Sequence, residues 1–303
     1  KYNEKIRKGY VDQSDLVEDL IKVEKPKKSE YREIENKAIA EIVERLQAMA
    51  RKAIRDNYTI SSNKVTHAMV DEAQDVLTSL IDAKDVDTFN ETLLKLFTVI
   101  PRKMGNVKDY LAEKSDDFSR IIQKEQDLLD VMKGQVVQKQ MIDENSEKDD
   151  IQNENTILEQ LGLVFEECST KDIAVIKDAL GSCSDRFYQA WRVKNVQTQK
   201  RYDDFVRENH ITNTKLLFHG SRNENWWSII NSGLALKPTN AVITGKMFGY
   251  GIYYAPKARK SLGYTSLDGS YWVRGNSKFG FMALMEVAYG KPYDVYSFDR
   301  KYY

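Results

Sequence analysis

The sequence predicts an α+β protein in which an all-helical bundle is followed by a domain built on a mixed or antiparallel sheet. Three observations support this fold class. Apolar residues recur every three or four positions between residues 34 and 132, and short apolar runs separated by glycine follow residue 156. The stretch at 143–155 between them, "DENSEKDDIQNEN", has almost no apolar residue. At 303 residues, the chain is also long for a single core.

These observations divide the chain into four parts. Residues 1–30 are predicted to form a short helix and a linker, 31–142 a helical domain, 143–155 an acidic linker and 156–303 the sheet domain. The sequence begins with Lys1 rather than Met and stops at "FDRKYY" without a clear terminal element, so we expect it to be part of a longer protein.

The helical domain is predicted from four apolar stripes with helical spacing. They run from Ile34 to Ala53, from Val65 to Leu80, from Phe89 to Phe97 and from Phe118 to Met132. Pro101 and Gly105 interrupt the pattern before the last stripe. Helices joined by short polar turns predict a bundle, for which a purely structural role is sufficient.

The C-terminal part alternates between one helix and several short strands. "KDIAVIKDAL" at 171–180 is predicted to be a helix and "SDRFYQAWRV" at 184–193 a strand or its approach. "KLLFHG", "GIYYA", "SYWV" and "GFMALMEVAYG" are predicted strands, separated by turns that contain glycine. Because strands follow one another without regular crossover helices, an antiparallel or mixed sheet is favoured.

The composition excludes several classes of protein. Lys plus Arg and Asp plus Glu number 46 each, so the net charge is zero and no overall electrostatic grip on nucleic acid is expected. The mean hydropathy is -0.58, and no apolar run approaches the roughly 20 residues that span a bilayer. Cys168 and Cys183 form no Cys-x-x-Cys pair, so we expect free thiols, a reducing compartment and no metal site.

The stretch "LLFHGSRNENWWSIINSGL" at 216–234 places polar residues between an expected strand and an expected helix. Ser221 and Glu224 have the spacing of a capping box, and Gly233 suits a left-handed helix end. Gly220 would let a flat ligand approach its backbone, although a tight turn explains the same glycine. His219 fits either a hydrogen-bonded core histidine or a ligand contact.

The stretch "GKMFGYGIYYAPKARKSLGY" at 245–264 combines glycines with aromatic residues. A strand is expected after the glycines, which argues against a dinucleotide loop of the Rossmann type. Tyr253 and Ala255 would share one strand face, and Ser261 and Tyr264 one side of the following helix. These rings suit either stacking on a planar ligand or an aromatic core.

Together these stretches resemble the catalytic domain of the poly(ADP-ribose) polymerases. The matching motifs are "FHGSR" at 218–222, Asn225, "SGL" at 232–234, "TGKMFGYGIYYA" at 244–255, "KSLGY" at 260–264 and "MEVAYG" at 285–290. "LFTVIPRKMG" and "DLLDVM" resemble the family's helical regulatory domain, and "KIRKGYV" at 5–11 resembles the end of a WGR domain.

The resemblance implies a site for NAD+ as substrate, without a metal. His219 would hold a ribose hydroxyl and the carboxamide, Gly220 would clamp the carboxamide, and Tyr253 and Tyr264 would stack on the two faces of the nicotinamide. Ser221 would lie beside the clamp, and Lys260 near the acceptor or the nicotinamide ribose. The other pocket residues implied are Asn225, Gly251, Tyr254, Ala255, Ser261 and, near the adenine, Asp130 of the helical domain.

The implied reaction releases nicotinamide from NAD+ and transfers ADP-ribose to a protein side chain or a growing chain. The family's catalytic glutamate would follow "MEVAYG", beyond Tyr303, and Glu286 is not expected to replace it because its segment aligns elsewhere. Ala235 and Lys246 replace an arginine and a tyrosine of nuclear family members, so Lys237 or Lys246 would contact phosphate instead. "TSLDGSYWVRGNSKF" at 265–279, with its Asp268–Gly269 turn, is expected to be an added hairpin.

The resemblance also implies regulation and partners. Deleting residues 31–142 from a complete enzyme is expected to raise basal activity, and an upstream WGR-like domain would bind DNA breaks. We expect proteins to be the acceptors of ADP-ribose and expect no association with a membrane. The expected location is the nucleus if the protein is eukaryotic and the cytoplasm if it is bacterial. A catalytically silent relative that binds NAD+ or ADP-ribose, or a nucleic-acid-associated module, is the alternative.

Overall fold

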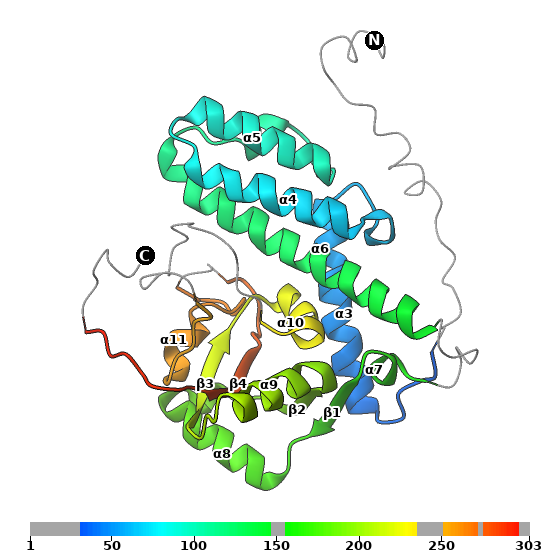
Figure 1. The fold of residues 1–303 in the computed structure, drawn as a ribbon, viewed down its shortest axis with the longest axis vertical. Coiled ribbons are helices and arrows are strands. Elements are labelled where there is room, and N and C mark those ends of the chain that lie inside the picture. Colours follow the sequence, from blue (N-terminus) through cyan, green and yellow to red (C-terminus); the bar gives the residue numbers. More distant parts are fainter. Residues whose placement is uncertain (1–30, 147–154, 235–250, 272–274, 297–303) are drawn as a thin grey trace. The chain divides into compact units, whose positions relative to one another are not determined.

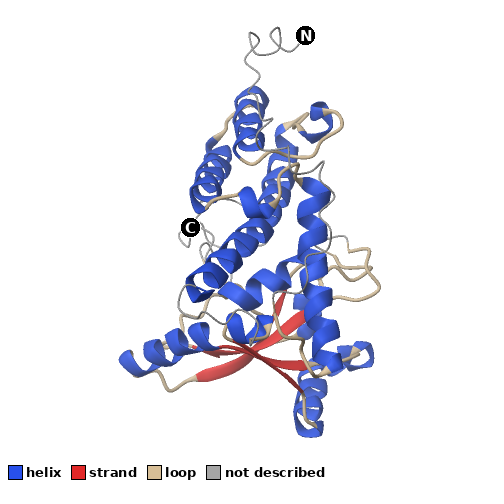
Figure 2. Cartoon of the chain, turned by 90° about the vertical axis from the view of Figure 1, so that its right-hand side faces the viewer, coloured by secondary structure: helices blue, strands red, loops and turns tan. Residues whose placement is uncertain are grey.

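We analysed a computed structural model of the chain, which describes residues 31–146, 155–234, 251–271 and 275–296. These residues form two compact units. The helical unit comprises residues 51–139, and the catalytic unit comprises the described residues of 31–50, 140–234 and 251–296. The chain contains both helices and strands, which are red in Figure 2, so the predicted α+β class is confirmed.

The helical unit contains three of the four helices that the apolar stripes predict and the end of the fourth. They are α4 (His67–Ser79), α5 (Val86–Val99) and α6 (Phe118–Ser146), which lie side by side (Figure 1). The end of α3 (Lys37–Asn57) also belongs to this unit. Thr66 and Asp85 cap α4 and α5 by accepting from backbone N–H groups of the first turn.

The core of the helical unit follows the predicted stripes. Leu77, Phe89, Leu93 and Met132 are each at most 1% exposed. The rings of Phe89 and Phe118 stack at 3.9 Å and join the first turns of α5 and α6. The spacing of three and four residues therefore identified most of the buried positions, although Leu94 within the stripe from Phe89 to Phe97 is 39% exposed.

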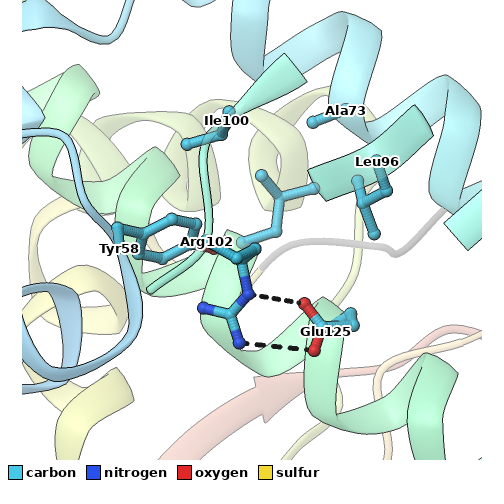
Figure 3. A pocket seen from close by; sticks show the side chains of 7 residues that line it. Tyr58, Ala73, Leu96, Ile100, Arg102 and Glu125 are labelled. Carbon is cyan, nitrogen blue, oxygen red and sulfur yellow. Dashed lines mark hydrogen bonds and ion pairs between the residues drawn. The ribbon is translucent and has the colours of Figure 1, made fainter. Parts of the chain in front are cut away.

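A buried ion pair interrupts this apolar core (Figure 3). Nε of Arg102 lies 3.1 Å from Oε2 of Glu125, and both side chains are at most 4% exposed. Nη1 of Arg102 also donates to the Asn57 carbonyl at 2.7 Å, and its guanidinium lies 4.7 Å from the Tyr58 ring centre. Burial raises the pKa of Glu125, while the charge of Arg102 opposes that rise.

The start of the predicted acidic linker is helical, because helix α6 continues through Asp143 to Ser146. Residues 147–154 lie outside the described residues.

Among the helices that the structure describes, none has both the length and the apolar character needed for a bilayer crossing.

The catalytic unit contains two antiparallel strand pairs. β1 (Leu163–Glu167) pairs with β2 (Trp191–Asn195), and β3 (Thr214–Gly220) pairs with β4 (Met282–Ala288). The helices of this unit, besides the shared α3 and α6, are α7 (Ile157–Gln160), α8 (Thr170–Leu180), α9 (Val196–Glu208), α10 (Trp226–Ser232) and α11 (Ala258–Leu262). Phe218, Cys183 and Ala258 form a buried cluster behind β3.

Two predicted strand features are wrong. Residues 251–255 form no regular strand, and only Ala255 bridges to β3, through reciprocal bonds with Phe218 of 2.8 and 2.9 Å. The Asp268–Gly269 turn exists, with Gly269 at φ 77°, but the residues of 265–279 that the structure describes form no antiparallel ladder. Instead Leu267 and Ser277 form a parallel bridge. The Asp268 N–H donates to the Ser277 carbonyl, and the Ser277 N–H donates to the Ser266 carbonyl. Of the predicted strand "SYWV" at 270–273, Trp272 and Val273 lie outside the described residues.

Candidate functional site

The candidate site lies where β3 ends and the chain turns toward α10. His219 is half-buried on β3, and its Nδ1 lies 3.0 Å from the carbonyl oxygen of Tyr253. A carbonyl only accepts hydrogen bonds, so Nδ1 carries the proton and Nε2 of the neutral ring is an acceptor. The rings of Trp226 and Tyr254 meet the imidazole edge to face, at 6.3 and 5.9 Å. The structure thus joins His219 to the 253–254 segment.

Gly220 is in close contact with α11. A Cβ at this position would lie 2.0 Å from the carbonyl oxygen of Ser261 and 2.8 Å from its carbonyl carbon. The Ser261 side chain is 4% exposed, and its Oγ donates to the Phe218 carbonyl at 3.1 Å. Gly220 is therefore required for packing of backbone against backbone, beyond the tight turn that the sequence allowed.

The capping box predicted at Ser221 and Glu224 is wrong. Helix α10 begins only at Trp226, after a 3-10 turn at Asn223–Asn225, and Ser221 caps neither element. The Ser221 hydroxyl instead accepts from Nδ2 of Asn225 at 3.1 Å, and Glu224 pairs with Nε of Arg222 at 2.9 Å. Because Asn225 holds its oxygen, Ser221 keeps its own proton available for a further bond.

Buried polar atoms without partners lie along α10. Oδ1 of Asn225, Oγ of Ser228 and Oδ1 of Asn231 have no hydrogen-bond partner among the described residues, and each residue is at most 8% exposed. Unsatisfied buried oxygens are costly unless a ligand or water meets them. Sequence reasoning identified Asn225 and missed the other two, although polar residues three apart on an otherwise apolar helix were a usable signal.

Tyrosine side chains gather beside His219. Tyr253, Tyr254 and Tyr264 are all half-buried. Burial raises the pKa of Tyr254 and of Tyr264, and a charge on Tyr253 would raise the pKa of Tyr264 further. The phenols of Tyr254 and Tyr264 are therefore protonated at neutral pH and can donate hydrogen bonds.

Other predicted site residues lie at the edge of this group or elsewhere. Lys260 is exposed on α11 beside Ser261, Gly251 is exposed, and Ala255 is buried against Phe218. Asp130 belongs to the helical unit, where it accepts from Nε2 of Gln126 at 3.0 Å. Ala235, Lys237 and Lys246 lie outside the described residues.

Glu286 occupies the wrong face of the sheet for catalysis. In the β3–β4 register, His219 pairs with Ala283 and Leu216 pairs with Glu286. Side chains alternate between faces along a strand, so Glu286 and His219 point to opposite faces. This register places Glu286 away from the His219 side chain, and its exclusion as the catalytic carboxylate stays a prediction. Cys168 and Cys183 are free thiols, and no group of three or more His, Cys, Asp or Glu in the described part of the chain could hold a metal.

Comparison with known proteins defines the class. Residues 170–301 match the family model of the poly(ADP-ribose) polymerase catalytic domain, which is an ADP-ribosyltransferase domain with NAD+ as its substrate. Residues 170–301 are therefore a catalytic domain of the poly(ADP-ribose) polymerase family, and relatives that carry that family's name match it at low identity. The WGR-like residues 5–11 lie outside the described residues.

Curated relatives resemble different lengths of the chain. "Uncharacterized protein 101L" of Invertebrate iridescent virus 6 is 34% identical over 154 residues, 50% of this chain and 62% of the relative. Poly [ADP-ribose] polymerase 1 of Danio rerio is 24% identical over 254 residues, 82% of this chain and 23% of the relative. Poly [ADP-ribose] polymerase 2-A of Oryza sativa subsp. japonica is 25% identical over 248 residues, 78% of this chain and 36% of the relative. The chain thus spans less than two thirds of each relative.

Proposed function

We propose that this chain is the regulatory and catalytic part of an NAD+-dependent protein ADP-ribosyltransferase, and that the nicotinamide of NAD+ binds beside His219. The contact between Gly220 and Ser261 carries this proposal. It brings a bare backbone, a buried hydroxyl and half-buried tyrosines together around one histidine. A carboxamide needs adjacent donors and acceptors, and a pyridine ring needs flat aromatic partners.

The proposed roles follow from the chemistry of these groups. The Gly220 backbone and the Ser221 hydroxyl bind the carboxamide, with Ser261 supporting the clamp. Tyr253 and Tyr264 stack on the pyridine. Nδ1 of His219 donates to the Tyr253 carbonyl, so Nε2 can accept a hydrogen bond from a ribose hydroxyl. Asn225, Gly251, Tyr254 and Ala255 line the pocket, and Lys260 lies near the acceptor.

The reaction is a glycosyl transfer. The bond between the ribose C1″ and the nicotinamide nitrogen breaks, and nicotinamide leaves with the electron pair. The acceptor oxygen bonds to C1″ and loses its proton. Positive charge develops on the ribose, so a carboxylate beside it would stabilise the transition state. Glu286 does not supply that carboxylate, because it points to the opposite face.

Replacing Tyr264 with alanine should weaken binding of benzamide, a carboxamide probe, by about tenfold to a hundredfold. The variant loses one stacking surface, whereas Tyr264→Phe keeps the ring and should bind almost as well as the native chain. Isothermal titration of the 303-residue chain measures both. A native chain that binds no benzamide, or a Tyr264→Ala variant that binds it equally well, would contradict the proposed site.

The silent relative is the second candidate function. On the face that His219 occupies, the neighbouring β3 and β4 residues are Leu217, Ala283 and Met285, and none of them is a carboxylate. Benzamide would bind under both functions. Release of nicotinamide from labelled NAD+ by the full-length protein, compared with its Tyr253→Ala variant, separates the transferase from the binding protein.

The helical unit is proposed to restrain NAD+ binding, and an upstream WGR-like domain is proposed to bind DNA breaks and relieve that restraint. Joining residue 50 to residue 140 by a Gly/Ser linker in the complete enzyme removes the helical unit alone. Basal activity should rise by about fivefold to a hundredfold, the range of ordinary coupling energies. Activity that stays equal or falls, while ADP-ribose binding is retained, would argue against the restraint. Nicked DNA should stimulate the complete enzyme and not the deletion variant.

A further inference from the structure

We propose that Asn223 is a positioning residue for the nicotinamide carboxamide. Its side chain fixes the turn that carries Gly220 and Ser221, without touching the ligand itself. This inference rests on the proposed function and adds a residue that neither the family resemblance nor the sequence pattern indicated.

The Asn223 side chain continues the β3–β4 ladder beyond its last backbone pair. The regular ladder ends at Gly220, which pairs with Met282. Nδ2 of Asn223 then donates to the Phe279 carbonyl at 3.1 Å, and the Phe281 N–H donates to Oδ1 of Asn223 at 3.2 Å. A side-chain amide carries one acceptor and two donors, so it replaces the peptide group that a longer strand would have provided.

The backbone of Asn223 is fixed as well. Its N–H donates to Oγ of Ser266 at 2.9 Å, and the Ser277 N–H donates to the Ser266 carbonyl at 2.9 Å. A Cβ on Gly280 would lie 2.8 Å from Oγ1 of Thr265 and 2.9 Å from its Cβ. Residues 265–266 and 277–281 are therefore packed too closely to shift independently.

The Asn223 side chain itself is buried. Asn223 is only 5% exposed, so its amide bonds do not compete with solvent. The rings of Phe279 and Phe281 meet edge to face at 5.6 Å. The guanidinium of Arg45 lies 5.5 Å from the centre of the Phe279 ring and covers the segment from outside.

Gly220 and Asn223 together fix the two residues that lie between them. Gly220 is held by the strand ladder and Asn223 by its amide, so Ser221 and Arg222 form a short turn fixed at both ends. Loss of the amide removes two of the bonds that hold the Asn223 end of that turn, and it leaves the Phe279 carbonyl and the Phe281 N–H without this partner. The Gly220 backbone and the Ser221 hydroxyl then no longer converge on one carboxamide.

Two ligands separate positioning from simple stability. Benzamide contains the carboxamide, whereas ADP-ribose lacks it and depends on the remainder of the cleft. Isothermal titration of the 303-residue chain should show benzamide binding weakened by about tenfold in Asn223→Ala and in Asn223→Asp, which cannot donate to Phe279. ADP-ribose binding should stay within about twofold in both variants.

Control variants make the result specific. Asn209 is an exposed asparagine whose Nδ2 donates to the Phe205 carbonyl, so Asn209→Ala should bind both ligands normally. Ser266→Ala removes the bond from the Asn223 N–H to the Ser266 hydroxyl and leaves the bonds of the Asn223 side chain in place. It should weaken benzamide binding by about threefold. If the Asn223 variants fail to fold, the Ser266→Ala result decides.

The possible outcomes have distinct meanings. A selective loss of benzamide binding supports the inference. Lower thermal stability with unchanged affinity for both ligands would show that Asn223 is only structural and would overturn it. A native chain that binds benzamide, with variants that bind it equally, defeats this inference alone. A native chain that binds no benzamide defeats the proposed function and this inference together.

Discussion

Replacing Gly220 with alanine should abolish benzamide binding, with a loss of at least about a hundredfold. The new Cβ would lie 2.0 Å from the Ser261 carbonyl oxygen, a separation that neither backbone can accommodate without moving. The turn must shift away from α11, and the clamp formed by the Gly220 backbone and Ser221 opens. Overpacking of this kind also costs about 1–3 kcal/mol of stability. Isothermal titration gives the affinity, and thermal unfolding gives the stability of the same sample.

A matched glycine provides the control for that variant. Gly290 follows β4, has nothing within 4 Å of an added Cβ and has no positive φ. Gly290→Ala should therefore bind benzamide normally and unfold at the native temperature or slightly above it. A Gly220→Ala chain that retains native affinity would mean that the carboxamide does not use this backbone, and that the close approach to Ser261 serves packing only.

The helices could be predicted from the sequence because burial repeats with their own period. Leu77 and Met132 were assigned to buried stripes, and both are at most 1% exposed. The same reasoning overlooked Arg102 and Glu125, since a stripe of apolar residues cannot indicate that two charged side chains share its core. Pro101 marked the end of a helix correctly, yet nothing local announced that the next residue turns inward.

Strand pairing was predicted less well, because alternation reports an extended chain and not its hydrogen-bond partner. Residues 251–255 alternate as a strand would, but only Ala255 bridges to Phe218. The Ser221–Glu224 spacing failed for a related reason. A capping box forms only where both side chains bond to the backbone of the first helical turn. Here the Ser221 hydroxyl accepts from Asn225 and the Glu224 carboxylate pairs with Arg222.

The centre of the site was predictable and its support was not. His219 and Gly220 lie at a strand end within a recognisable motif, and the structure brings them to Tyr253 and Ser261. Asn223 stands in the same stretch of sequence, but its role depends on a segment more than fifty residues away. Only tertiary structure brings such partners together.

Replacing Glu125 with leucine should destabilise the helical unit by about 3–5 kcal/mol, because the buried guanidinium of Arg102 loses its only described carboxylate. The double variant Arg102→Met/Glu125→Leu should return to within about 2 kcal/mol of the native unit or exceed it, since an apolar pair fills the same volume without a desolvation cost. Hydrogen exchange of amides in α4 and α6 measures this unit separately from the catalytic one.

An exposed pair and a pH series complete that experiment. Lys52 and Asp56 form an ion pair in water on α3, so Asp56→Ala should leave exchange rates unchanged. Burial raises the pKa of Glu125 above its ordinary 4.5, so the folded unit retains the proton longer than the unfolded chain does. Native stability should therefore fall, relative to the double variant, as pH rises above about 4.5. A single variant as stable as the native unit would mean that water reaches Arg102, and the pair would then be a surface contact in energetic terms.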